Sequence, residues 1–136
     1  MKKKLLVFVS LMLVFIAGSA YVQTFSLEKS IAQGKESYIT QCQNCHMEDG
    51  KGMSGVFPPL AKADFLKRPV KEVIEVIVKG QSGDITVNGV KYTGIMPAQD
   101  YLTDEQIADI LNYVYNNWGN KSANPVLPAM VAKARA

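Results

Sequence analysis

The segment Cys42-Gln43-Asn44-Cys45-His46 constrains this chain more than any other stretch of its sequence. A C-x-x-C-H pattern is typical of a covalent haem attachment site. Residues three and four apart lie on one face of a helical turn, so Cys42 and Cys45 can reach the two vinyl groups of one haem and form thioethers. His46 lies four residues after Cys42 and would offer its imidazole to the iron from the same side. One short turn therefore predicts two covalent anchors and one axial ligand.

Other roles for these cysteines fit the sequence less well. A structural zinc site needs about four Cys or His ligands, whereas the chain has 2 Cys and 1 His. A thioredoxin-like redox pair belongs with a βαβ pattern, and no such pattern precedes Cys42. A disulfide that closes so short a loop would constrain little of the chain. Haem attachment is therefore the prediction.

The first twenty residues have the pattern of an export signal. Residues 2–4 are all lysine, residues 5–17 form a nearly unbroken apolar run, and residues 18–20 are small. The run is shorter than the about 20 apolar residues of a membrane span. We therefore expect residues 1–20 to be a signal peptide and the mature protein to be periplasmic or otherwise extracytoplasmic. The alternative is an uncleaved N-terminal anchor that associates with the membrane, because Tyr21 extends the apolar stretch.

The formal net charge of +3 comes from the lysines at residues 2–4. The 15 Lys and Arg residues less those three leave 12, which equals the 12 Asp and Glu residues. A neutral domain of this kind lacks the footprint of a nucleic-acid-binding protein. The charges cluster nevertheless, and we interpret both clusters as solvated surface. The basic cluster is Lys62, Lys67, Arg68 and Lys71, and the acidic cluster is Asp100, Asp104, Glu105 and Asp109.

Capping and periodicity signals predict helices over residues 30–42, 69–80 and 103–119. The first and last begin with S/T-x-x-Q capping boxes, Ser30 with Gln33 and Thr103 with Gln106. Gly34 is unusual inside a helix, where glycine costs about 0.5–1 kcal/mol relative to alanine. A close crossing by another helix would explain it.

Asn88-Gly89 between two β-prone triplets predicts a hairpin over residues 85–92, since both turn positions need a positive φ. An isolated hairpin is marginal in water, so we expect it to pack on another part of the chain, and the haem edge is the candidate. The segments outside the central domain, 30–119, are predicted to be a linker over residues 21–29 and a C-terminal tail over 120–136. A short turn of helix after Pro128 is the most structure we expect there.

A six-coordinate haem needs a second ligand, and the sequence contains no second histidine. Methionine is the next choice for a haem of this type. Met96 is the strongest candidate, because Pro97 favours an extended conformation for it and Gly94 adds flexibility. Met53 lies only seven residues after His46 and is the weaker candidate. The alternative role for Met96 is to fill space in the core.

These features together resemble the class I, mitochondrial-type cytochromes c, and in particular bacterial mono-haem c-type cytochromes. The resemblance spans about residues 30–119 and is carried by Gly34, Tyr38, Cys42, Cys45, His46, Pro58-Pro59-Leu60, Met96-Pro97 and Tyr113. It implies an all-α class I cytochrome c fold around one covalent haem c, with a small β-hairpin insertion near residues 85–92. It also implies that the first and last helices cross at Gly34 and Tyr113. A third implication is that Pro58 or Pro59 offers its carbonyl to the ligand imidazole.

The resemblance implies an electron carrier rather than an enzyme. Cys42 and Cys45 would bind one haem c through two thioethers, and His46 and Met96 would fill both axial positions of the iron. The expected partners are redox proteins of the respiratory chain, a reductase, an oxidase or a dehydrogenase, which dock weakly and transiently at the haem edge.

Two other classes of protein stay open. A labile Met96 would favour a haem enzyme or gas sensor, and a permanent neighbour would favour a fixed subunit of a larger oxidase or dehydrogenase.

Overall fold

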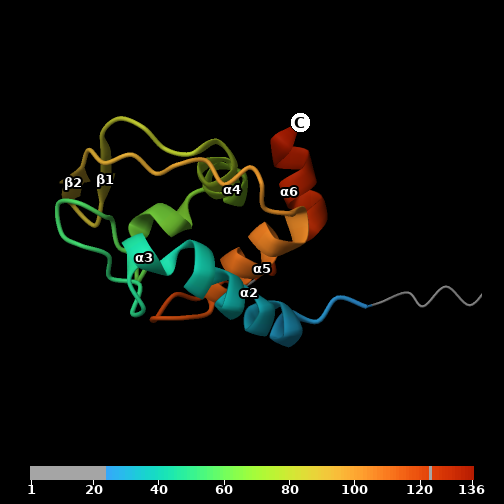
Figure 1. The fold of residues 1–136 in the computed structure, drawn as a ribbon. Helices are drawn as coiled ribbons and strands as arrows, with labels where there is room; N and C mark the ends of the chain where they lie inside the picture. The colour runs from blue at the N-terminus through green and yellow to red at the C-terminus, as the bar shows by residue number, and fades with distance from the viewer. Residues whose placement is uncertain (1–23, 123) are drawn as a thin grey trace, which may run out of the picture.

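The computed structural model describes residues 24–122 and 124–136. Its regular structure is mostly helical with one two-stranded hairpin (Figure 1), as predicted. In chain order the elements are α2 (Leu27–Gln41), α3 (Gln43–His46), the 3₁₀ helix η1 (Asp64–Lys67), α4 (Val70–Lys79), β1 (Ile85–Val87), β2 (Val90–Tyr92), α5 (Asp104–Tyr115) and α6 (Pro128–Arg135). No helix in these two ranges is both long enough and apolar enough to cross a membrane. The predicted signal peptide, residues 1–20, lies outside the described residues.

Helices α2 and α5 cross at Gly34, as the sequence predicted. A Cβ atom at Gly34 would lie 1.9 Å from the carbonyl oxygen of Asp109 and 2.9 Å from the Cβ of Tyr113. Any larger side chain would therefore push the two helices apart, which explains why the helix carries a glycine at this point despite its cost.

Helix α2 begins three residues earlier than expected, within the segment predicted to be a linker. Ser26 is its N-cap, and the Ser26 side chain accepts a hydrogen bond from the backbone N–H of Lys29 at 3.3 Å. The predicted capping box of Ser30 and Gln33 is wrong, because Ser30 lies inside the helix and is buried. Its hydroxyl instead donates to the Asp109 carboxylate across the helix crossing.

Helix α5 begins with the capping box that the sequence predicted. The Thr103 backbone N–H donates to Gln106 Oε1 at 2.9 Å, and the Gln106 N–H donates to Thr103 Oγ1 at 3.2 Å. The helix ends at Tyr115, earlier than the predicted end at Gly119. Trp118 and Gly119 both have a positive φ, 52° and 83°, so the chain has already left the right-handed helical conformation.

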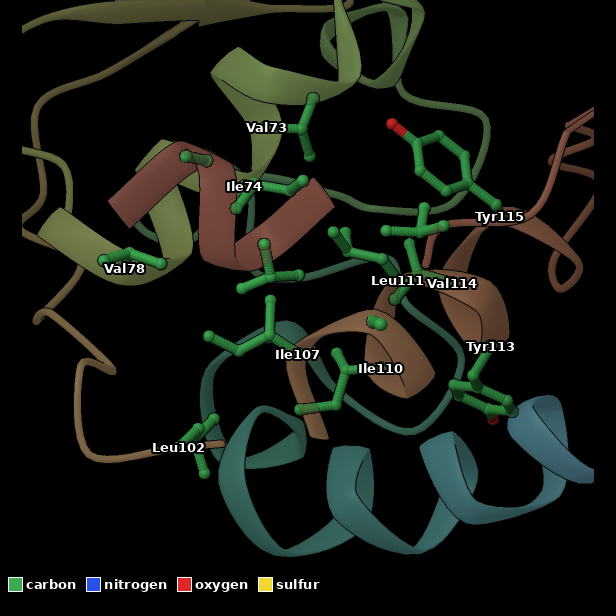
Figure 2. Packing of buried hydrophobic residues seen from close by; sticks show 14 of the residues in the cluster. Val73, Ile74, Val78, Leu102, Ile107, Ile110, Leu111, Tyr113, Val114 and Tyr115 are labelled. Atoms are coloured by element: carbon green, nitrogen blue, oxygen red, sulfur yellow. The ribbon is translucent and has the colours of Figure 1, made fainter. Parts of the chain in front are cut away.

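The main core lies among α2, α4, α5 and α6 (Figure 2). Ile74 of α4 and Val131 of α6 are completely buried in it. Tyr38, Tyr113 and Trp118 form an aromatic triangle at one side, with ring centroids 5.1–5.4 Å apart. Such tilted and edge-to-face pairs add to the free energy of burial, so they strengthen the α2–α5 crossing.

Helix α6 occupies the segment predicted to be a tail. It packs against α4 and α5, as Figure 1 shows, and buries Val131 and Ala134. Asn112 of α5 fixes the preceding connection through two hydrogen bonds. Its side-chain amide donates to the Val126 carbonyl at 2.8 Å, and its Oδ1 accepts from the Val126 N–H at 2.7 Å. The C-terminal segment is thus tied to the core on both sides of Pro128.

The β1–β2 hairpin turns at Asn88 and Gly89, which have φ angles of 52° and 79°. Asp64 holds this turn, since its backbone N–H donates to Asn88 Oδ1 at 2.9 Å and its Oδ1 accepts from the Asn88 N–H at 2.8 Å. Val87 and Tyr92 are buried in a second small core under the hairpin. Both side chains also line the cavity described next, which agrees with the predicted packing.

Candidate haem site

An apolar cavity lies beside the C-x-x-C-H turn, among α3, α4, α5, the hairpin and the loop that carries Met96. Its empty space is about 1090 Å³, part of it open to solvent. Ligand pockets are concave and mostly apolar, and the lining of this cavity is of that kind. Its apolar walls include Leu60, Val73, Ile77, Val87, Ile110 and Val114.

The attachment turn forms one wall of this cavity. Cys42 ends α2 and caps α3, and its carbonyl oxygen accepts hydrogen bonds from the N–H groups of Cys45 at 3.2 Å and His46 at 3.0 Å. All three residues line the cavity. The structure therefore brings together the two cysteines and the histidine that the sequence motif predicted.

The electrostatics of Cys42 argue against a thiol–disulfide redox pair. Burial, and to a lesser degree the neighbouring Cys45, raises the pKa of the Cys42 thiol to about 12. Reactive cysteines of the C-x-x-C redox type have lowered pKa values instead. Both side chains are free thiols in the structure, and Cys45 is exposed at the edge of the cavity.

His46 is held in one orientation by the loop that follows it. Its Nδ1 lies 3.0 Å from the carbonyl oxygen of Pro58, so the Nδ1–H donates there and Nε2 keeps its lone pair. Of the two prolines considered for this contact, Pro58 makes it. Burial lowers the pKa of His46, and the Pro58 hydrogen bond opposes that change only in part. The imidazole is therefore neutral at neutral pH, which is the form that binds metals.

The loop with Met96 forms another wall. The Met96 backbone pairs with Gln81 just after α4, with both N–H···O distances at 2.9 Å. The half-buried Met96 side chain lines the cavity. Among the methionines in the described ranges, Met96 is the only one that does so, and Met53 is 48% exposed. Met47, at the end of α3, and Met130, on α6, are likewise absent from its lining.

Sequence reasoning did not identify the residues that set the position of Met96. Gly80 is the last residue of the helix predicted over residues 69–80, but a Cβ there would also lie 2.6 Å from the Met96 carbonyl oxygen and 2.8 Å from the Ala98 nitrogen. Gly80 also has a φ of 76°. A glycine can end a helix without such a neighbour, so no signal in the sequence pointed to this contact.

Three exposed apolar side chains belong to the two loops beside the cavity. Ile95 is 75% exposed, Val56 46% and Met53 48%, and the Val56 N–H donates to the Met53 carbonyl at 2.9 Å. Val56 and Ile95 line the cavity, and a Cβ at Gly94 would come within 3.0 Å of the Val56 carbonyl oxygen, so the two loops touch. We call Met53, Val56 and Ile95 the apolar rim.

Comparison with known proteins assigns this arrangement to a family. The family model for cytochrome c matches residues 31–118. The chain belongs to the cytochrome c family. This match covers the attachment turn, the Pro58 loop, the hairpin, Met96 and α5, and it confirms the family and the fold that the sequence predicted.

Relatives of the chain include small cytochromes c of similar length. One cytochrome c-552 of Thermus thermophilus is 38% identical over 125 residues, which is 86% of this chain and 84% of that protein. A second Thermus thermophilus cytochrome c-552 is 40% identical over 113 residues, which is 77% of this chain and 86% of that protein. The cytochrome c subunit of a quinone alcohol dehydrogenase from Gluconacetobacter polyoxogenes is 29% identical over 115 residues, which is 75% of this chain and 22% of that subunit.

Family membership and the pair Cys42 and Cys45 together identify the cofactor as a covalently bound haem c, as predicted. The chain is accordingly a mono-haem electron carrier rather than an enzyme, and redox proteins are its partners.

Proposed function

We propose that this cytochrome c carries single electrons between respiratory redox partners outside the cytoplasmic membrane. Cys42 and Cys45 attach its haem, and His46 and Met96 bind the iron. The observation that carries this proposal is that one apolar cavity is lined by all four of these residues. A bound haem supplies one-electron chemistry at its iron, and the remaining properties come from the chain.

His46 would bind the haem iron through Nε2. The Nδ1–H···O bond to Pro58 fixes the tautomer and the ring orientation, and it makes the ligand more basic. Since burial keeps the imidazole neutral, no proton has to leave before the iron is bound. The ligand is therefore pre-organised by its own loop.

Met96 would bind the haem iron through its sulfur. Its backbone pairing with Gln81 supports the choice, because it keeps the segment extended along the end of α4 with the side chain in the cavity wall. A thioether with a histidine raises the reduction potential of a cytochrome c. With His46 and Met96 both bound, no coordination position is left for oxygen or a substrate, so electron transfer is the natural chemistry.

The apolar rim is the docking surface for the partners. Contacts between redox proteins are small and transient, and an exposed apolar patch beside a cavity is the kind of surface that such partners bury.

The coverage of the relatives supports a carrier over a fixed subunit, since cytochrome c-552 matches over most of its length and the dehydrogenase subunit over about a fifth. Residues 1–20 are the signal that exports the chain.

Covalent attachment tests this proposal directly. Denaturation of the native protein in acidic organic solvent should leave the haem on the polypeptide, and intact mass should show one haem per chain. Cys42→Ala and Cys45→Ala should each keep a single thioether, and the double variant should release all haem. Haem extracted freely from the wild-type protein would refute the proposal.

A further inference from the structure

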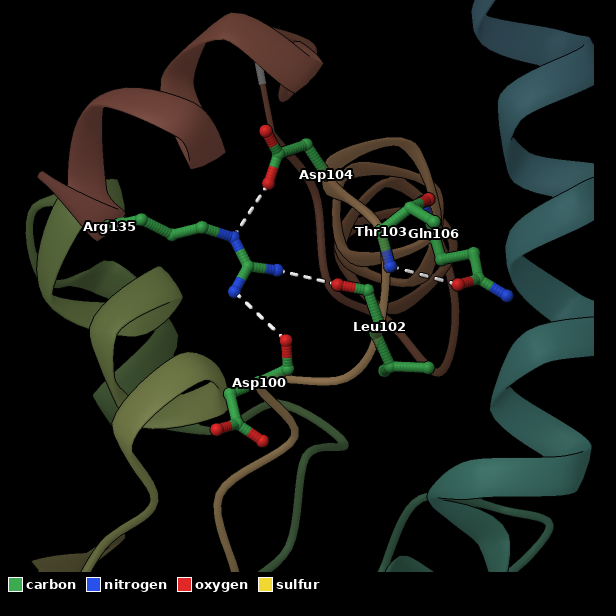
Figure 3. A network of polar contacts seen from close by, with 6 residues as sticks. All are labelled: Asp100, Leu102, Thr103, Asp104, Gln106 and Arg135. Atoms are coloured by element: carbon green, nitrogen blue, oxygen red, sulfur yellow. Dashed lines mark hydrogen bonds and ion pairs between the residues drawn. The ribbon is translucent and has the colours of Figure 1, made fainter.

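The end of α6 returns to the segment that follows Met96. The cytochrome c family model matches residues 31–118, so α6 lies outside the matched region. Its last residue, Arg135, nevertheless reaches the loop before α5 and the first turn of α5 (Figure 3). An element outside the matched region therefore contacts the segment that follows the proposed distal ligand.

Arg135 uses three nitrogen atoms on three acceptors of this segment (Figure 3). Nε donates to Asp104 Oδ1 at 2.7 Å, Nη1 to the Asp100 carbonyl at 3.1 Å, and Nη2 to the Leu102 carbonyl at 2.5 Å. A guanidinium is planar and its donors are fixed relative to one another. The three acceptors are therefore fixed relative to one another as well.

We call the three hydrogen bonds of Arg135 the clamp, and the helix that carries it is firmly packed. Val131 and Ala134 bury α6 against the core at 0% and 4% exposure, so the backbone beside Arg135 has little freedom. The side chains of Arg135 and Asp104 are 27% and 30% exposed, well below the 63% and 59% of the surface pair Lys91–Asp84. A partly buried ion pair is screened less by solvent than such a surface pair.

The segment between Met96 and α5 is held mostly by polar contacts. Tyr101 is 65% exposed, and Leu102 is the first buried residue after Met96. The Tyr101 hydroxyl donates to Gln41 Oε1 at 2.8 Å, which ties the segment to the end of α2. The backbone N–H of Gln99 donates to the Ile77 carbonyl at 2.8 Å, which ties the segment to α4 on one side. Arg135 ties it to α5 and α6 on the other side, so polar contacts replace the missing apolar burial.

We propose that Arg135 is a positioning residue for Met96. By clamping residues 100–104, the C-terminal helix keeps the methionine segment closed over the cavity, so the sulfur stays on the iron. Without the clamp, residues 97–103 would lift more often and Met96 would leave the iron more often. This inference rests on the proposed role of Met96 as distal ligand.

The test uses the haem-loaded full chain and carbon monoxide as the probe. At saturating carbon monoxide, the binding rate to the ferrous protein reports how often Met96 leaves the iron. We expect Arg135→Gln to bind carbon monoxide faster by on the order of tenfold, the factor that one charge-assisted hydrogen bond represents. Amide hydrogen exchange in residues 97–103 should accelerate in the same variant. Arg135→Lys and Asp104→Asn, which each keep part of the clamp, should show smaller changes in the same direction.

Two matched controls separate positioning from general destabilisation. Lys133→Gln removes the same charge from an exposed position two residues away on α6, and it should leave the rate unchanged. Gly34→Ala disturbs the α2–α5 crossing and should lower stability at a position that Arg135 does not contact. Equal rates for Arg135→Gln and Lys133→Gln, or an equal acceleration by Gly34→Ala, would overturn the inference. A wild-type ferric protein without a sulfur–iron near-infrared band would overturn the proposed Met96 ligation itself, and the inference with it.

Discussion

At the scale of single residues, Gly34 determines how closely α2 and α5 approach. On helix propensity alone, Gly34→Ala should stabilise α2 by about 0.5–1 kcal/mol. Because a Cβ would lie 1.9 Å from the Asp109 carbonyl oxygen, we predict the opposite sign, a loss of about 1–3 kcal/mol as in other overpacked sites. Urea unfolding followed by circular dichroism measures it, with Ala32→Gly on the exposed face of α2 as the propensity control. An unchanged or higher stability of Gly34→Ala would contradict the observed crossing.

Asp109 lies at the same crossing and should make stability depend on pH. Burial raises the pKa of its carboxyl, and the hydrogen bond from Ser30 only partly opposes this. A folded-state pKa above the unfolded value of about 3.9 means that the folded protein binds the proton more tightly. The contribution of Asp109 to stability is then greatest below that value and declines as pH rises through the folded-state pKa.

Asp109→Asn should remove this pH dependence, since the amide stays neutral and its Oδ1 still accepts from Ser30. We predict that the variant gains stability relative to wild type as pH rises from about 3 to about 7. Urea midpoints at three pH values measure the difference. A constant difference across that range would show that the Asp109 pKa is not raised in the folded protein.

At the scale of elements, the junction between α4 and the methionine segment has the tightest backbone contact at the site. Gly80→Ala would place a Cβ 2.6 Å from the Met96 carbonyl oxygen. We predict a weakened near-infrared band of the ferric protein, because the Met96 backbone has to move away from Gln81. Gly83→Ala is the control, since Gly83 has a similar φ of 85° and no atom within 4 Å of its added Cβ. Equal spectra for the two variants would mean that only backbone strain matters.

Elements with strong local signals could be predicted from the sequence. Asn88-Gly89 predicted the hairpin and Thr103 with Gln106 the start of α5, because turn and capping geometry depend on a few neighbouring residues. The same local reasoning gave a wrong helix start at Ser30. Its spacing to Gln33 matches a capping box, but its hydroxyl donates to Asp109, which is far away in the sequence.

Elements that depend on distant contacts could be predicted only in part. The sequence predicted at most a short turn of helix after Pro128, because α6 buries little beyond Val131 and Ala134 and its apolar stripe is short. Arg135 was indistinguishable from a solvated surface charge until its three acceptors were known. The acidic cluster is likewise more than solvated surface, since Asp104 pairs with Arg135 and Asp109 accepts from Ser30. The spacing of the sequence motif was enough to propose Cys42, Cys45 and His46 as site residues. The close contact between Gly80 and the Met96 backbone, in contrast, could be seen only in the structure.

At the scale of the whole molecule, near-zero net charge beyond residue 4 leaves little long-range steering of partners. We predict that Ile95→Ser, at the apolar rim, weakens the apparent affinity for an oxidase-containing membrane preparation from the host by about tenfold. Phe25→Ser, which removes an apolar side chain that is 46% exposed before α2, is the control.

The electron-transfer rate should also vary little with ionic strength. A steep fall with salt would instead indicate that the basic cluster of Lys62, Lys67, Arg68 and Lys71 directs docking.

The identity of the distal ligand decides whether the iron of this carrier is closed to other ligands, because an open iron position would permit binding. The most direct measurement is the near-infrared sulfur–iron charge-transfer band of the ferric protein, in wild type, Met96→Ala and Met53→Ala. We predict the band in wild type and in Met53→Ala, and its loss in Met96→Ala together with a lower reduction potential and much faster carbon monoxide binding. A band that survives in Met96→Ala, or that is absent from the wild type, would contradict Met96 ligation.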